Sequence, residues 1–278
     1  MASTIPLTLS TPDPGPRRWM IEGFKQSWEH RDLLLHLVQR NLKVKYQRSV
    51  LGFLWTLLNP LVTIGIMLTI FGFVLRLDIP KYWAFLLSSY FVWNFVFQCL
   101  ASGSTLLHQH TALLRSVPVP SEVLILGEVG SRFIEFSVEV ALAVVALSVF
   151  HHQGIPASYI LLPVLCLLML LVTLGLVMPI ATLAAYYNDV QHTLPLVLLL
   201  LFYISPVFYP PRMVPRQLLP LYHVNPIAGL LQLFQTVLYE GAWPVLSNFV
   251  AFSSASVIVF LVGWLLFARY RRLFPEIL

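Results

Sequence analysis

Four ionisable residues lie within the long apolar stretch of residues 127–150. Arg132, Glu135 and Glu139 share one helical face at i, i+3 and i+7, and Glu128 precedes Arg132 by four residues. Charged groups at membrane depth need partners, and on a helix both Glu128 and Glu135 are within reach of Arg132. The spacing therefore predicts a structural ion pair near the inner interface, and it leaves open a proton or ion relay through Glu139.

The sequence contains no motif for nucleotide hydrolysis or metal catalysis. It has no G-x-x-x-x-G-K-[ST], no G-x-G-x-x-G, no H-E-x-x-H and no Cys/His set at metal-binding spacing. The adjacent His151 and His152 are weak evidence for a metal, and Cys99 and Cys166, both in apolar runs, are predicted to be buried free thiols. Transport against a gradient would thus need a separate motor, which could push on the loops around residues 117–126 and 186–192.

The composition is that of a polytopic membrane protein. Of 278 residues, 58% are hydrophobic and 10% are charged, and the mean hydropathy is +0.80, whereas soluble domains carry about 25% charged residues. The Pro-rich first segment, residues 1–18, has no apolar core, so we expect a flexible tail and no secretory signal. The N-terminus is then expected to stay inside the cell.

Apolar runs predict an all-α fold with six transmembrane helices. Residues 19–50 alternate apolar and basic positions at helical spacing and predict an amphipathic helix on the cytoplasmic surface, or a plain basic anchor for anionic lipid. Between the last two spans, residues 212–243 are too polar for a confident crossing and predict re-entrant or interfacial helices. The six spans are expected at about 54–75, 82–107, 127–150, 158–185, 194–209 and 248–268, within a transmembrane domain of residues 51–272.

Positive charge sets the expected orientation. With six spans and both termini cytoplasmic, 13 of the 17 Lys and Arg residues lie inside and only Arg76, Lys81, Arg212 and Arg216 lie outside. A Ser121-Glu122 pair on the inner side predicts the capped start of a short helix between the second and third spans. That helix must pack on the bilayer or on a partner protein.

Polar and proline residues inside two spans predict kinks. Asn59-Pro60 follows Trp55 in the first turns of the first span, and Ser205-Pro206 breaks the stretch that begins at Asn188 and Asp189. Phe202, Tyr203 and Tyr209 gather near the far end of that stretch. They form either an interfacial aromatic belt or the lining of a conduit.

Three stretches carry a resemblance to a known family. YQRSVLGFLWTLLNPL (46–61), YYNDVQHTLPLVLLLLFYISPVFYP (186–210) and YHVNPIAGLLQLFQTVLYEG (222–241) are similar to the signature stretches of the ABC-type polysaccharide export permeases, which carry O-antigen, capsule or teichoic-acid polymers. The resemblance covers about residues 32–272, with the segments in family order. Asn188 departs from it, because many members have a basic residue there.

The resemblance implies the subunit of a larger machine in the bacterial inner membrane. It implies a homodimer of six-span subunits bound to two nucleotide-binding ATPase subunits, which hold ATP and Mg, so that this chain is no enzyme and needs no cofactor or nucleic acid. It also implies motor contacts through the amphipathic helix and the inner loops, and an outer gate before the last span. We assign the residues by role: coupling, Arg40, Lys43, Ser121, Glu122 and Asp189; entrance and kink, Trp55, Asn59 and Pro60; outer gate, Tyr209, Tyr222, Asn225 and Pro226.

A lipid-linked polysaccharide would need many weak contacts along its path. Sugars stack on aromatic rings and accept hydrogen bonds. An aromatic ring can contact a sugar without leaving a buried polar atom unpaired. The alternatives are an ATP-driven lipid or drug exporter, or an ion-coupled carrier or membrane-embedded enzyme that uses Glu135, Glu139 and His192. Co-purification of an ATPase subunit distinguishes the exporters, which require one, from the ion-coupled carrier and the membrane-embedded enzyme. For a sugar channel we predict a lining of Tyr90, Trp93, Phe97, Phe202 and Tyr203.

Overall fold

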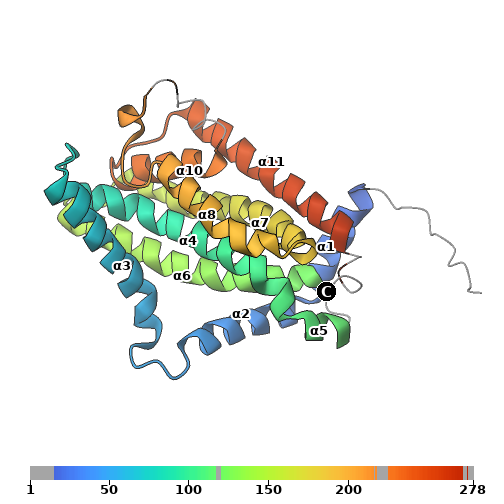
Figure 1. The fold of residues 1–278 in the computed structure, drawn as a ribbon. Coiled ribbons are helices and arrows are strands. Elements are labelled where there is room, and N and C mark those ends of the chain that lie inside the picture. Colours follow the sequence, from blue (N-terminus) through green and yellow to red (C-terminus); the bar gives the residue numbers. More distant parts are fainter. Residues whose placement is uncertain (1–15, 117–119, 216, 218–224, 272–273, 275–278) are drawn as a thin grey trace, which may run out of the picture.

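The computed structural model describes residues 16–116, 120–215, 217, 225–271 and 274, and throughout these ranges its regular structure is helical (Figure 1). This confirms the predicted all-α polytopic class. The α-helices are α1 (Pro16–Glu29), α2 (Arg31–Tyr46), α3 (Trp55–Met67), α4 (Tyr82–Gln109), α5 (Thr111–Ser116), α6 (Ser121–Phe150), α7 (Leu162–Tyr186), α8 (Asp189–Ile204), α10 (Pro226–Leu238) and α11 (Leu246–Tyr270).

Five helical segments of the described chain are long and apolar enough to cross a membrane. They are Gly52–Val74, Tyr82–Gln109, Ser121–Phe150, Ala157–Tyr186 and Leu246–Tyr270. The fifth expected span, at 194–209, corresponds to α8, whose 16 residues extend about 24 Å, less than a hydrocarbon core of about 30 Å. Its helix ends at Ile204 because Pro206 cannot continue it, so the predicted end at residue 209 was too late.

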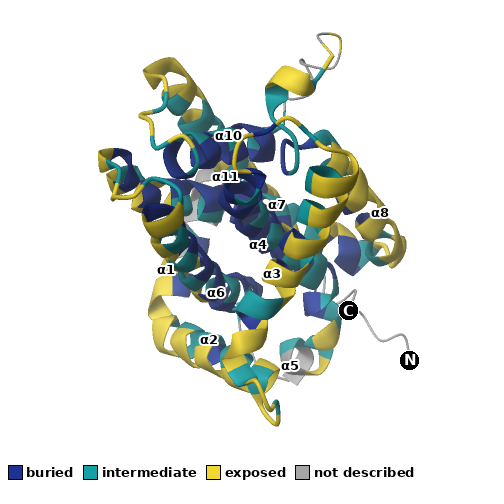
Figure 2. Ribbon diagram, turned by 90° about the vertical axis from the view of Figure 1, so that its left-hand side faces the viewer, coloured by how far each residue is buried: buried dark blue, intermediate teal, exposed yellow. Residues whose placement is uncertain are grey.

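The centre of the bundle is formed by α4 and α7, and the other spans lie around them (Figure 2). In the most apolar stretch of α4, 72% of the residues are buried, whereas the corresponding share is only 11% in the segment that contains α3. Pro60 lies inside α3, and the C-terminal continuation of this helix, Leu68–Val74, winds as a π-helix. The first span thus stands at the edge of the bundle with most of its surface uncovered.

Two glycines let α7 and α11 approach each other at backbone distance. A Cβ atom on Gly263 would lie 2.0 Å from the Gly175 carbonyl oxygen, and one on Gly175 would lie 2.6 Å from the Val259 carbonyl oxygen. Neither neighbour is a side chain that could rotate away. This contact fixes the last span against the core of the bundle.

The amphipathic N-terminal segment consists of two helices. A break at His30 separates α1, which packs on α11, from α2, which packs along α6. The close fit of α2 is visible at Gly127, where a Cβ would come within 2.9 Å of the Leu37 Cβ. The single continuous helix expected from periodicity was wrong, because the two halves have different packing partners.

The Ser121-Glu122 pair begins the third span itself. Ser121 is the first residue of the 30-residue helix α6, and a separate short helix, α5, comes earlier. Glu122 is 1% exposed and forms an ion pair with Arg271 beyond the end of α11. The prediction of a short, separate helix starting at Ser121 was therefore wrong, since the apolar pattern from Val123 onward is continuous with the span.

Between the last two spans lie a 3-10 turn, Pro211–Met213, and α10. Asn225 caps α10 by accepting hydrogen bonds from the backbone amides of Ile227 and Ala228 at 3.0 and 3.3 Å. These elements agree with the short helices predicted for residues 212–243. Three predictions fall outside the described residues: most of the flexible tail, the loop at 117–119 and the gate residue Tyr222.

Candidate functional site

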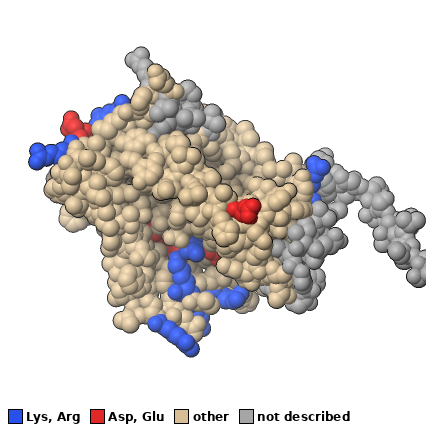
Figure 3. Space-filling model, in the orientation of Figure 1, with Lys and Arg blue, Asp and Glu red and all other residues tan. Residues whose placement is uncertain are grey.

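Two adjoining cavities open where α2, α3, α4 and α6 meet. The first, of about 350 Å³, lies between α2, the end of α4 and α6, and the second, of about 240 Å³, lies between α3, α4 and α6. Lys45 and Glu135 line both. Figure 3 shows basic side chains gathered in a hollow of this surface, with acidic ones behind them. We call this side of the bundle the α2 end and the side that carries α10 the α10 end.

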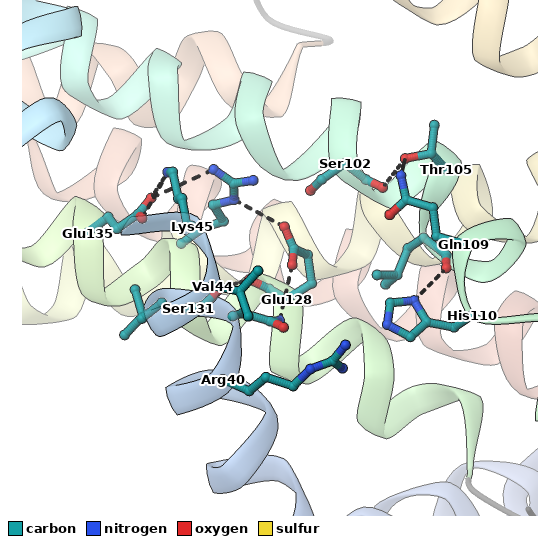
Figure 4. Close-up of a pocket in the computed structure, with 14 residues that line it drawn as sticks. Arg40, Val44, Lys45, Ser102, Thr105, Gln109, His110, Glu128, Ser131 and Glu135 are labelled. Atoms are coloured by element: carbon teal, nitrogen blue, oxygen red, sulfur yellow. Dashed lines mark hydrogen bonds and ion pairs between the residues drawn. The ribbon is translucent and has the colours of Figure 1, made fainter. Parts of the chain in front are cut away.

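In the first cavity, polar side chains of α2 and α6 meet face to face (Figure 4). The Arg132 Nε donates to Glu128 Oε1 at 3.1 Å, and Asn41 Nδ2 of α2 donates to Glu128 Oε2 at 3.2 Å. The Arg132 guanidinium also lies 3.8 Å from a Glu135 oxygen. The intrahelical ion pairs predicted from spacing are therefore present, and they are extended by a neighbouring helix.

Three helical elements meet at the Glu135 carboxylate, and we name this contact the Glu135 junction. Lys45 Nζ lies 2.8 Å from each Glu135 oxygen, and the Tyr46 hydroxyl donates to the same carboxylate. Since the phenol proton is given to Glu135, the Thr56 hydroxyl at the start of α3 donates to the Tyr46 oxygen. The Glu135 side chain is 8% exposed. The junction ties α2, α3 and α6 to one another.

Four charged groups at this site are paired. Lys45 and Arg132 face Glu128 and Glu135, so each of these four groups has a partner of opposite sign within 4 Å. Burial and the Glu135 carboxylate raise the pKa of Tyr46, which keeps its phenol protonated as a donor. Spacing alone could not reveal Lys45 as a partner, because it lies 90 residues before Glu135. The sequence indicated only that a buried acidic side chain needs a positively charged partner.

The second cavity is lined by polar stripes from two spans and by acids from a third. On α3, Thr56, Asn59 and Thr63 recur at i, i+3 and i+7, and on α4 the stripe is Tyr90, Asn94 and Gln98 at i, i+4 and i+8. Asn94 Nδ2 donates to Glu139 Oε1 at 3.3 Å. Amides, hydroxyls and rings of this kind offer many hydrogen bonds and ring contacts without a nucleophile paired to a base.

Every predicted entrance residue lies at the second cavity. Trp55, Asn59 and Pro60 line it, together with Tyr90 and Phe97 from the predicted sugar lining. Asn59 is exposed in the single chain although it belongs to a spanning segment. The cavity is therefore open on the side where α3 lacks a neighbour.

The other aromatic residues of the predicted lining lie further along the bundle. Trp93 is 4% exposed and packs on Phe202 with ring centroids 5.6 Å apart, while Tyr203 is 54% exposed. Phe202 continues to Phe208 at 5.6 Å, and Phe208 stacks on Phe71 at 4.8 Å. The predicted set is thus divided between the second cavity and this aromatic cluster towards the α10 end.

The residues assigned to coupling occupy different environments. Arg40 lines the first cavity, Lys43 is exposed on α2, and Asp189 is exposed in the first turn of α8. Glu122 and Ser121 are buried, which differs from the surface position that a direct partner contact requires. Only Arg40, Lys43 and Asp189 are placed as predicted for such a contact, and their coupling role stays a prediction.

The residues of the alternative chemistry are not brought together. Glu135 and Glu139 both line the second cavity, but His192 does not and is exposed near the start of α8. Across the described ranges, no group of three His, Cys, Asp or Glu side chains could hold a metal ion.

The described residues of the predicted gate lie between the end of α8 and the start of α10. The Tyr209 hydroxyl donates to the Tyr203 carbonyl at 2.6 Å, and Asn225 and Pro226 begin α10.

Comparison with known proteins places this arrangement in a family. The chain matches the family described as ABC-2 type transporter over residues 32–239. It is 30% identical to the O-antigen export system permease protein RfbA of Myxococcus xanthus, an alignment that covers 92% of this chain and 99% of the relative.

More distant relatives have related names. The RfbA protein of Klebsiella pneumoniae is 25% identical over 89% of this chain and 95% of its own length, and the polysialic acid transport protein KpsM of Escherichia coli is 22% identical over 74% and 80%. A match over most of the chain, with the polar cavities inside the matched region, leads to one conclusion: this protein belongs to the ABC-2 type transporter family and is a multi-pass membrane subunit of that family.

Proposed function

We propose that this chain is the permease subunit of an ATP-driven exporter of lipid-linked polysaccharide, of the O-antigen or capsule type. Family membership and the names of its relatives support a permease role, and the ATPase is a separate subunit. In this proposal two copies of the chain assemble with two ATPase subunits in the bacterial inner membrane. Both termini and the α2 end face the cytoplasm.

The second cavity is the observation that carries this proposal. A sugar chain crossing the membrane exchanges its hydrogen bonds with water for hydrogen bonds with protein, so its path needs a continuous supply of neutral polar groups. The stripes on α3 and α4 supply hydroxyl and amide groups, with Tyr90 and Phe97 as ring surfaces. The Glu135 junction lies at one end of this cavity. A movement of α2 can therefore change the shape of the cavity.

The open side of the cavity supports the homodimer. Polar side chains such as Asn59 are costly where they face lipid, and only 11% of the residues in the most apolar stretch of the α3 segment are buried in the single chain. A second copy seated against α3 would cover these side chains and close the cavity into a conduit between the two subunits. The exposed start of α8 and the basic face of α2 are then available to the ATPase subunits.

We expect the polar stripe of α3 to be required for export. Asn59→Leu removes an amide from the second cavity, and we expect export to fall about fivefold, as the loss of one hydrogen bond worth about 1 kcal/mol implies. The measurement is the rate of polysaccharide translocation into vesicles that contain the complete permease–ATPase complex, relative to the amount of complex.

Two threonines in the same spanning segment, Gly52–Val74, give a matched control. Thr63 lines the cavity and Thr69 does not, while each hydroxyl bonds to the carbonyl four residues earlier, at 3.0 and 2.9 Å. Thr63→Val should reduce export and Thr69→Val should not. Equal export by both variants, with a fully active Asn59→Leu, would remove the second cavity from the transport path.

A further inference from the structure

A third cavity, the outer pocket, lies at the α10 end. Its volume is about 310 Å³, near the lower limit of the range of about 300–1,000 Å³ for small-molecule sites. The turn between α3 and α4 supplies Ile79 and Pro80, α4 supplies Phe85, and the segment after α8 supplies Pro210, Pro211 and Arg212. Since α4 runs from Phe85 to the first cavity near Gln109, the two sites occupy opposite ends of the bundle.

The polar wall of the outer pocket is one face of α10 and its C-terminal extension. Gln232, Gln235, Thr236, Tyr239 and Glu240 follow one another at i, i+3, i+4, i+7 and i+8. Gln235 donates to the Pro206 carbonyl at 2.5 Å and the Tyr239 hydroxyl to the Pro80 carbonyl at 2.6 Å. Within the described part of the chain, the side chains of Gln232, Thr236 and Glu240 make no hydrogen bond or ion pair. An amide, a hydroxyl and a carboxylate thus remain available to a ligand.

Two adjacent histidines that follow α6 hold one end of this wall in place. His151 Nε2 and His152 Nε2 donate to the carbonyls of Tyr239 and Leu238, each at 2.8 Å, at the C-terminal end of α10. Lys81 Nζ donates to the His151 carbonyl at 2.8 Å. Burial lowers the pKa of His151, which keeps the imidazole neutral. The wall is therefore preorganised, which reduces the entropy that a ligand loses on binding.

The composition of the outer pocket fits a sugar ring. Ile79 and Phe85, both buried, and three proline rings form an apolar floor, while Arg212 and Glu240 add a guanidinium and a carboxylate to the amides. A pyranose has the matching character, because its C–H face is apolar and its hydroxyls both donate and accept. An acyl chain would leave the polar wall unpaired at a cost of about 1–3 kcal/mol for each group.

An aromatic cluster lies between the second cavity and the outer pocket. Trp93, three residues after Tyr90 on α4, contacts Phe202, and Phe202 contacts Phe208, which comes two residues before the Pro210–Pro211 segment of the pocket. We propose that the outer pocket binds one sugar unit of the exported chain as it leaves the permease. This inference rests on the proposed function and adds a site at which the polymer is held between transport steps.

The test is direct binding to the complete complex in nanodiscs. The probe is an oligosaccharide fraction released by mild acid from the surface polysaccharide of the cells that carry this protein, and binding is followed by saturation-transfer NMR. We expect Gln232→Ala combined with Thr236→Val to weaken binding by about fivefold or more, as expected for lost hydrogen bonds. Asn248→Ala, an exposed polar change at the start of α11 outside the pocket, is the control and should bind as the wild type does.

The possible results separate failure of the sugar site from failure of the proposed function. Wild-type affinity in the double variant would overturn the sugar site, as would displacement of the fragments by glycerol phosphate, which would reveal a lipid-headgroup site. A wild-type complex that exports polysaccharide but binds no fragment also overturns the site and leaves the proposed function intact. A wild-type complex that hydrolyses ATP but exports no polysaccharide overturns the proposed function and this inference with it. Co-purification of the ATPase with each variant confirms assembly.

Discussion

Replacing Glu135 by glutamine is expected to reduce polysaccharide export at least tenfold, the largest functional effect that we predict for a single side chain. The change keeps the shape of the residue but leaves Lys45 and Arg132 facing a neutral group. Because Lys45 is 39% exposed, water screens part of the loss, which stays below the range of about 3–5 kcal/mol for a fully buried pair. It also weakens the acceptor of the Tyr46 hydroxyl. Movement of α2 would then no longer be transmitted to α3 and α6. The measurement is export per ATP hydrolysed by the reconstituted complex.

An exposed ion pair of the same N-terminal segment provides the control. Lys25 and Glu29 pair at 3.7 Å on α1, with side chains 73% and 54% exposed, and such pairs contribute at most about 1 kcal/mol. Glu29→Gln should therefore leave coupling unchanged. A double-mutant cycle of Lys45→Met and Glu135→Gln should show less than additive losses, because both remove the same contact. Wild-type coupling in Glu135→Gln, or fully additive losses, would contradict the role of the junction.

Replacing Gly263 by alanine is expected to have the largest effect on folding. The added methyl group would lie 2.0 Å from the Gly175 carbonyl oxygen, which is backbone and cannot rotate away. The helices α7 and α11 must separate, and we expect a loss of about 3 kcal/mol or more, at the upper end of the range for overpacked cores. The measurement is the thermal midpoint and the yield of monodisperse protein extracted from membranes.

The same substitution elsewhere in a span serves as its control. Gly65 of α3 has nothing within 4 Å of the position of its Cβ. Gly65→Ala should therefore keep the wild-type midpoint and yield. If Gly263→Ala and Gly65→Ala behave alike, the close contact of α7 and α11 is not a determinant of the fold.

The sequence predicted those features that depend on local pattern. Apolar runs identified the spans, and helical spacing identified the pairing of Arg132 with Glu128, because both are properties of neighbouring residues. The break at His30 was missed because each half of the N-terminal segment is helical by itself, and only its packing on α11 or on α6 distinguishes the two halves.

The site required information on distant contacts. Lys45 and Glu135 are 90 residues apart, and no periodicity links them. Asn59, Tyr90 and Phe97 were selected as polar or aromatic residues within spans, and the fold places them at one cavity because α3 and α4 run side by side. Trp93 belongs to the same helix as Tyr90, but its position three residues later turns it towards Phe202 and into the protein.

The most direct test of a polysaccharide path along α3 is photocrosslinking in cells that synthesise the polymer. A photoreactive amino acid is placed at Thr63, which lines the second cavity, or at Thr69, which lies outside the cavity in the π-helical continuation of the same span. After illumination, the permease is purified and probed for covalently attached polysaccharide. We predict attachment at position 63 and little or none at position 69. Attachment at neither position, or equally at both, in cells that export the polymer normally would contradict a transport path through the second cavity.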